Sequence, residues 1–160
     1  MESTSRETGG LPVRSGPPPS TTPTNPHQQL DQNAPAELQE KLYERTRTLP
    51  GVVEGPSGIS VPGARAFLLE EAGGPPEAFL IGKEFAHLHP RYDGSLHLTL
   101  PPDLAAEALE KGWGKPHPLA GKYGVPSTVV MIYGPRNEEE LEVVWGIVRA
   151  SYDFARGERR

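Results

Sequence analysis

The alternation of polar and apolar positions is clearest at residues 95–100, which read Ser-Leu-His-Leu-Thr-Leu. A strict period of two is typical of a strand that buries one face and leaves the other open. Shorter apolar runs, separated by glycine and proline, predict further strands over 64–71 and 77–89 and a short strand over 58–61. The mostly apolar run at 128–136 predicts a strand at the centre of the sheet.

A helical period replaces this alternation in three places. Leucines at positions 38 and 42 predict a helix over 35–48, and a second apolar stripe predicts one over 102–111. The last helix is expected to begin after Asn137, whose spacing to Glu140 is that of a helix-capping pair. This order of elements predicts one α+β domain. We expect a mixed or antiparallel sheet of about four strands, with helices mainly on one face and the other face available for a site.

Residues 1–33 have a different composition, rich in Pro, Ser, Thr, Gln and Asn and poor in apolar residues. Such a segment buries too little apolar surface to offset the entropy of ordering it. We therefore predict a disordered tail over 1–33 and a folded domain over 34–157. His27 falls in this tail and receives no role.

Composition and charge narrow the classes of function. The net charge is −5, which argues against nucleic acid as a partner because phosphate binding needs a basic surface. The chain has no cysteine, so disulfides and thiolate metal sites are excluded. The sequence has no apolar run of membrane-spanning length and no signal-peptide pattern at its start, so we expect no membrane partner and a cytoplasmic location.

Three of the five histidines lie within residues 85–100. Side chains alternate along a strand, so His87 and His89 are expected to point the same way, together with Phe85. His97 lies on the polar side of the next strand. The connection decides whether the two sets of histidines meet.

A three-residue hairpin loop over Tyr92–Gly94 would put glycine at the left-handed position that such loops require. This loop pairs His89 with His97 and His87 with Thr99, and it keeps the leucines together on the other face. A two-residue loop would mix leucine and histidine on both faces, which conflicts with burying one of them. We therefore expect the first register.

Directly opposed side chains have Cβ atoms about 5 Å apart, so His87, His89 and His97 are predicted to converge. Three imidazoles are a common ligand set for zinc, whereas non-haem iron prefers two histidines and a carboxylate. A divalent metal, zinc or iron, is one hypothesis for this cluster. A metal-free pocket that uses the histidines for hydrogen bonding or acid–base chemistry is another, and inert surface histidines are a third. Glu84, expected on the opposite face, is a poor ligand candidate, and Asp93 is expected to stabilise the turn.

The sequence offers three further candidates. Trp113 and His117 lie in a loop that could fold over the histidine face, with His117 adding a ligand or a proton-transfer group. Arg136 lies at a strand–helix junction, where it could hold an anion or form a structural salt bridge. The catalytic candidates are His87, His97 and His117, and the ligand-binding candidates are Trp113 and Arg136.

A resemblance to the family of luciferase domain-containing proteins, small proteins of bacteria and fungi, is carried by three segments: GKEFAHLHP, GSLHLTLPPDLAAEALEKGWGKPHPLA and VPSTVVMIYGPRNEEELEVV. It extends from about Gly55 to Ala155. Within it lie an H-x-H-P segment, an S-L-H strand, a G-W-G-x-x-H-P-L loop and a Y-x-P-R segment. The resemblance implies one shared site made by His87, His89, His97, His117 and Arg136.

Two functions remain open at this point. The first is a protein of this family with a histidine-lined site for a small molecule on the open sheet face, acting as an enzyme with or without a divalent metal. The second is a non-catalytic module that binds a ligand or another protein. The residues alone do not decide between them, nor do they identify the substrate.

Overall fold

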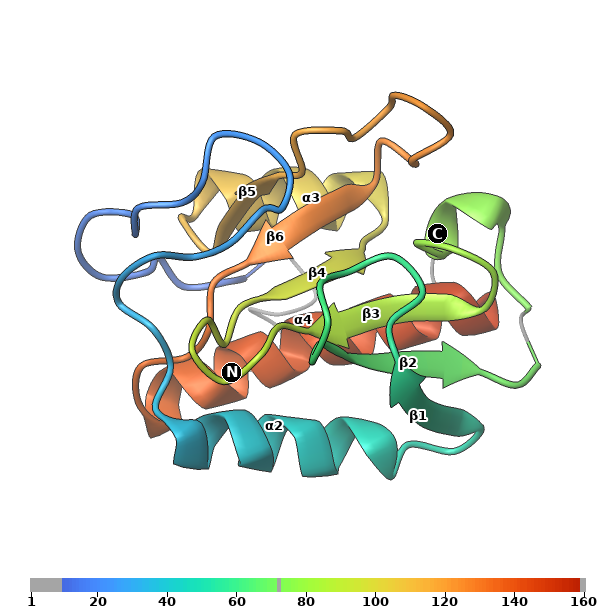
Figure 1. Ribbon diagram of the computed structural model, residues 1–160, viewed down its shortest axis with the longest axis horizontal. Coiled ribbons are helices and arrows are strands. Elements are labelled where there is room, and N and C mark those ends of the chain that lie inside the picture. Colours follow the sequence, from blue (N-terminus) through green and yellow to red (C-terminus); the bar gives the residue numbers. More distant parts are fainter. Residues whose placement is uncertain (1–9, 72, 159–160) are drawn as a thin grey trace.

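A computed structural model describes residues 10–71 and 73–158, which form an α+β domain (Figure 1). The elements, in chain order, are α2 (Ala36–Arg47), β1 (Val52–Pro56), β2 (Arg65–Leu69), the short 3-10 helix η1 (Pro76–Ala78), β3 (Glu84–Leu88), β4 (Leu96–Thr99), α3 (Pro102–Glu110), β5 (Gly114–Pro116), β6 (Val129–Ile132) and α4 (Glu138–Arg156). The predicted fold class and its three helices are confirmed.

Within the described residues the sheet has six strands in the order β1-β2-β3-β4-β6-β5, and every neighbouring pair is antiparallel. The sequence predicted about four strands, and the two additional ones, β1 and β5, lie at the edges. Strand β5 approaches β6 closely at Gly114, where a Cβ atom would lie 2.0 Å from the carbonyl oxygen of Met131. Only glycine allows this approach without moving the backbone.

The expected strand over 58–61 is wrong, because the chain turns there. The Ser57 hydroxyl accepts hydrogen bonds from the backbone N–H groups of Ile59 and Ser60, at 3.2 and 3.0 Å. Such a side-chain bond to the backbone competes with strand pairing. The strand lies just upstream instead, at β1.

Helix α4 lies behind the sheet in Figure 1 and packs on its leucine face. The core between them contains Leu88, Leu96, Leu98, Ile132, Leu141, Val144 and Val148, all with less than 3% of their surface exposed. The predicted cap of α4 is confirmed, since the Asn137 side chain accepts a hydrogen bond from the Glu140 N–H at 2.8 Å. The helices leave the histidine face of the sheet uncovered.

The N-terminal segment, residues 10–33, starts beside the end of α3, loops past the β5–β6 edge of the sheet in Figure 1, and brings His27 to that opposite face. Side chains of the folded domain fix the segment along its length. Trp113 Nε1 donates to the Pro12 carbonyl at 2.6 Å, and Lys115 Nζ donates to Thr21 Oγ1 at 2.9 Å. This segment belongs to the predicted disordered tail, whose first residues, 1–9, lie outside the described residues.

Among residues 10–71 and 73–158, no helix combines the length and the apolar character that crossing a membrane requires.

Candidate functional site

All five histidines of the chain meet on the face of the sheet opposite α4. His87 lies on β3, His89 follows that strand, and His97 lies on β4. His27 reaches them from the N-terminal segment and His117 from the loop after β5. Together they line a cavity of about 360 Å³, whose other walls include Asn25, Pro26, Gln28, Ile59, Ser60, Val61, Leu80, Leu119, Val125 and Val129. The size is that of a small-molecule site.

The hairpin that carries three of these histidines has a longer turn than the sequence predicted. His87 pairs with His97, and the His89 N–H donates to the Ser95 carbonyl at 2.9 Å. The expected pairing of His89 with His97 is therefore wrong by two residues. Because the shift is even, all three side chains still lie on the same side of the sheet.

The turn itself explains the shift. It runs over residues 90–94, and the Pro90 carbonyl accepts hydrogen bonds from both the Asp93 and the Gly94 N–H groups. The Asp93 carboxylate then accepts from the Ser95 N–H at 2.9 Å and from the Ser95 hydroxyl. Gly94 has φ +79°, so the left-handed glycine is confirmed. Asp93 stabilises the turn, as expected.

A β-bulge places Glu84 on the histidine face, which corrects its expected position. On β2, Phe67 pairs with Ala86 and the next residue, Leu68, pairs with Glu84, so Phe85 is the extra residue. A bulge lets two consecutive side chains share a face. Phe85 accordingly lies in the core, with its ring centroid 6.0 Å from that of Tyr152, rather than beside His87 and His89.

Hydrogen bonds fix which nitrogen of His87 carries a proton. Its Nδ1 lies 2.8 Å from Glu84 Oε2, and an ionised carboxylate only accepts, so Nδ1 is the donor. His87 Nε2 therefore presents a lone pair to the cavity. Glu84 also accepts from the Ser57 hydroxyl at 2.8 Å and from the Gly58 N–H at 3.0 Å, which holds the carboxylate in place.

The same reasoning applies to His89. Its Nδ1 lies 2.9 Å from Ser95 Oγ, whose own proton goes to Asp93. His89 Nδ1 is therefore the donor, and in the neutral ring its Nε2 is a second lone pair aimed into the cluster. This relay keeps Asp93 ionised: burial raises the pKa of Asp93, but hydrogen bonds from His89 and Ser95 outweigh burial and lower it overall.

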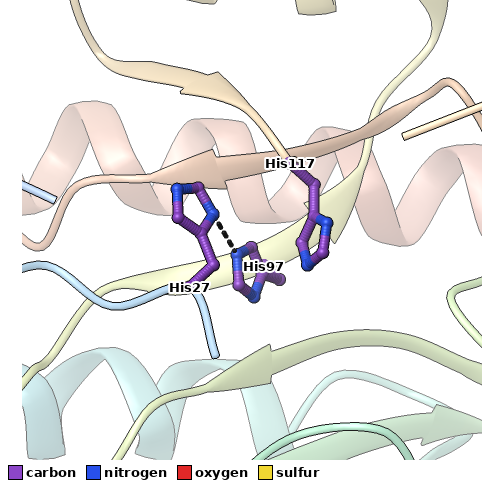
Figure 2. A group of neighbouring side chains, drawn as sticks. All are labelled: His27, His97 and His117. Carbon is purple, nitrogen blue, oxygen red and sulfur yellow. Dashed lines mark hydrogen bonds between the residues drawn. The ribbon is translucent and has the colours of Figure 1, made fainter. Parts of the chain in front are cut away.

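Both lone pairs point at His97. The distance to His97 Nδ1 is 3.2 Å from His87 Nε2 and 3.0 Å from His89 Nε2. On its other side, His97 Nε2 lies 3.0 Å from His27 Nδ1. Figure 2 shows His97 between His27 and His117, with this contact as the dashed line.

His117 has a different role from the other imidazoles, because the Leu119 N–H donates to its Nδ1 at 3.0 Å. In the neutral ring the proton must then be on Nε2. His117 thus offers a hydrogen-bond donor at the cavity rather than a lone pair.

Burial disfavours the charged form of four of the five imidazoles. It lowers the pKa of His97 well below the ordinary value and also lowers the pKa of His87, where the Glu84 hydrogen bond opposes the effect only partly. The pKa of His27 falls to about 4, first through burial and then through the nearby His117. The pKa of His117 is lowered by burial and by His87 and His89. Neutral imidazoles are the form that binds metals.

Two sets of three histidines have nitrogens close enough to hold a metal ion: His87, His89 and His97, and His27, His97 and His117. Metal–nitrogen bonds of about 2.0–2.1 Å put ligand nitrogens about 3.0–3.4 Å apart, which agrees with the 3.0 and 3.2 Å contacts in the first set. In the second set, the lone pair of His117 already accepts a backbone hydrogen bond. The donor chemistry therefore favours the first set.

Trp113 and Arg136 lie away from the cavity and hold the N-terminal segment. Arg136 pairs with Glu140 and also donates to Gln32 Oε1 at 3.0 Å and to the Ser15 carbonyl at 2.8 Å. The structural salt bridge, which the sequence left as one alternative for Arg136, is present. Conversely, sequence reasoning missed two residues of the site, His27 and Glu84. The local sequence pattern gives no sign of either residue. His27 reaches the site through contacts between segments distant in sequence, and Glu84 turns toward the site because of the β-bulge.

The comparisons with known proteins confirm the resemblance. Residues 82–151 match the family model described as Luciferase domain. Over 74 residues the chain is 47% identical to proteins named luciferase from Armillaria gallica, Armillaria mellea and Neonothopanus nambi. The match covers 45% of this chain and spans 28% of the length of each of those relatives. No solved structure matches. Of the five histidines, His27 alone lies outside residues 82–151.

Proposed function

Because residues 82–151 match the luciferase domain, we propose that the chain is an enzyme for a small organic molecule. We propose further that its histidine cavity holds a divalent metal on His87, His89 and His97. The main support for this metal site is that His87 Nε2 and His89 Nε2 converge on His97 Nδ1. Without a metal, a single proton on His97 Nδ1 has to serve two buried lone pairs, which leaves at least one of them poorly satisfied. A metal ion accepts all three lone pairs.

The partners of the outer nitrogens support the same proposal. Metal-binding histidines usually donate their other N–H to a carboxylate or another acceptor, which fixes the ring and makes the ligand more basic. Glu84 serves His87 in this way, and Ser95 and Asp93 serve His89. A set of three imidazole ligands without a coordinating carboxylate favours zinc over non-haem iron, and the Glu84 carboxylate is already engaged by His87, Ser57 and Gly58.

The walls of the cavity indicate the class of substrate. Among the described residues that line it, none is Lys, Arg, Asp or Glu, and six are aliphatic: Ile59, Val61, Leu80, Leu119, Val125 and Val129. Apart from the proposed metal, these walls give a charged group no counter-charge, so a charge placed away from the metal would be desolvated at a cost. We therefore propose a largely apolar molecule whose polar oxygen lies at the metal. The bound metal would act as a Lewis acid on that oxygen, and His117 Nε2–H would donate a hydrogen bond to the ligand.

Metal content tests the proposal. The protein is purified without a His-tag, supplied with zinc, iron or manganese, and analysed by mass spectrometry together with His89→Ala and His117→Ala. We expect about one metal per chain in the wild type, loss of the metal in His89→Ala, and retention in His117→Ala because that ring is not a ligand. A wild type that binds no metal would overturn the metal centre. The cavity would then be a metal-free binding site, as in the non-catalytic alternative.

A further inference from the structure

We infer that His27 is a positioning residue of the proposed metal centre: it holds the proton of His97 on Nε2 and so leaves Nδ1 free to bind the metal. The inference rests on the proposed function and adds to it a residue from the N-terminal segment. His27 lies well before residue 82, where the segment that matches the luciferase domain begins, so the comparisons assign it nothing.

The geometry around His97 carries the inference. A neutral imidazole has one proton and one lone pair, so a partner on one nitrogen decides the role of the other. His27 Nδ1 lies 3.0 Å from His97 Nε2, and the two ring planes are inclined by only 20°. With His27 as acceptor, the His97 lone pair is on Nδ1, where His87 and His89 present theirs. His27 thus does for His97 what Glu84 does for His87.

His97 has no other acceptor of this kind among the described side chains. Its side chain is 4% exposed, and the hydrogen bonds found for its Nε2 go to His27 alone. His117 lies close, with ring centroids 4.6 Å apart, but its Nδ1 lone pair is used by Leu119. Removing the His27 ring therefore leaves the proton of His97 without a fixed position.

The N-terminal segment is built to hold His27 at this point. Residues 21 and 29 pair as an antiparallel bridge, and the Thr22 side chain closes the hairpin by accepting from the Gln28 N–H and donating to the Pro26 carbonyl, both at 2.8 Å. The Gln29 N–H donates to Asp93 Oδ2 at 3.2 Å. The carboxylate that orients His89 therefore also fixes the hairpin that carries His27.

Zinc affinity and a spectrum of the bound metal test the inference. Competition with a chelator gives the zinc affinity, and the visible absorption of Co²⁺ reports the ligand geometry. We expect His27→Ala to weaken zinc binding by roughly 10- to 100-fold and to alter the Co²⁺ spectrum, as for other partners of metal-bound histidines. In His27→Asn, the side-chain oxygen replaces Nδ1 as acceptor and should restore most of the affinity. His27→Phe, which fills the space without an acceptor, should not.

Lys115→Ala is the matched control, because it removes an anchor of the segment at Thr21 and keeps the imidazole. We expect its zinc affinity to stay within about twofold of wild type, since it alters no group that touches a ligand. Wild-type affinity in both His27→Ala and His27→Phe would overturn the inference while leaving the metal centre in place. Equal losses in Lys115→Ala and His27→Ala would also overturn it, by showing that the segment matters and the imidazole does not. A wild type that binds neither zinc nor Co²⁺ would overturn the proposed metal centre and this inference together.

Discussion

Glu84 and His87 lie three residues apart on one strand and still share a face of the sheet, with Glu84 Oε2 2.8 Å from His87 Nδ1. In a regular strand, residues three apart point to opposite faces. The bulge at Phe85 removes one step of the alternation. A carboxylate is thereby placed behind an imidazole, the arrangement found in many metal sites.

This pair gives the first prediction. Glu84→Gln keeps the shape of the side chain but removes its charge and one acceptor oxygen. We expect zinc affinity to fall by roughly 10- to 100-fold, because His87 becomes less basic and its ring less fixed. Chelator competition measures the change. The exposed Glu77→Gln serves as control and should bind zinc as the wild type does. Unchanged affinity in Glu84→Gln would show that the carboxylate has no part in metal binding.

The second prediction concerns the other product of the bulge, the buried ring of Phe85. This side chain is fully buried and packs on Tyr152 of α4. Phe85→Ala should lower the free energy of unfolding by about 3–5 kcal/mol, because it leaves a cavity in the core. Urea denaturation measures the loss. Ile81→Ala, at a side chain that is 46% exposed, should change it by less than about 0.5 kcal/mol. Similar losses in the two variants would place Phe85 outside the core.

The sequence predicted the parts of this fold that depend on the regular spacing of apolar residues along a strand or a helix. The leucines at 96, 98 and 100 indicated which face of β4 packs in the hydrophobic core, and the helical stripe after Asn137 indicated the helix that covers it. The same alternation put His87, His89 and His97 on the opposite face. An error of two residues in register did not change this conclusion, because the strand period is two.

The rest of the site depends on contacts that no local pattern encodes. The bulge arises where β3 pairs with β2, so the sequence of β3 alone gave no sign that Glu84 would turn toward the histidines. The composition around His27 is that of a disordered segment, and its position depends on partners about 60 to 100 residues away, such as Asp93 and Trp113. Long-range contacts of this kind become visible only in the folded chain.

The third prediction compares two glycines with positive φ. A Cβ atom on Gly94 would lie 2.5 Å from Gln39 Nε2, whereas one on Gly82 would meet nothing within 4 Å. Gln39 cannot move freely, because this nitrogen donates to the Ala34 and Arg91 carbonyls. We expect Gly82→Ala to cost about 1 kcal/mol of unfolding free energy through backbone strain alone. Gly94→Ala should cost about 1–3 kcal/mol more through the clash.

Thermal and urea denaturation of the two glycine variants measure the difference. Equal costs at both positions would mean that Gln39 yields to the added methyl group. The turn over residues 90–94 would then tolerate more side-chain volume than its packing indicates.

The last prediction is the pH dependence of stability in the metal-free protein. Burial lowers the pKa of His27 from 6.5 to about 4 and also lowers those of His87, His97 and His117. Between pH 6.5 and 4 the unfolded chain therefore binds more protons than the folded one, so the free energy of unfolding must fall as the pH falls. Each histidine that stays neutral in the folded state contributes up to about 1.4 kcal/mol per pH unit. Urea denaturation of protein treated with chelator, at several pH values in this window, measures the slope. His27→Phe should reduce the slope of unfolding free energy against pH by the contribution of one histidine. A slope that is flat or of opposite sign in the wild type would mean that these histidines are protonated in the folded protein.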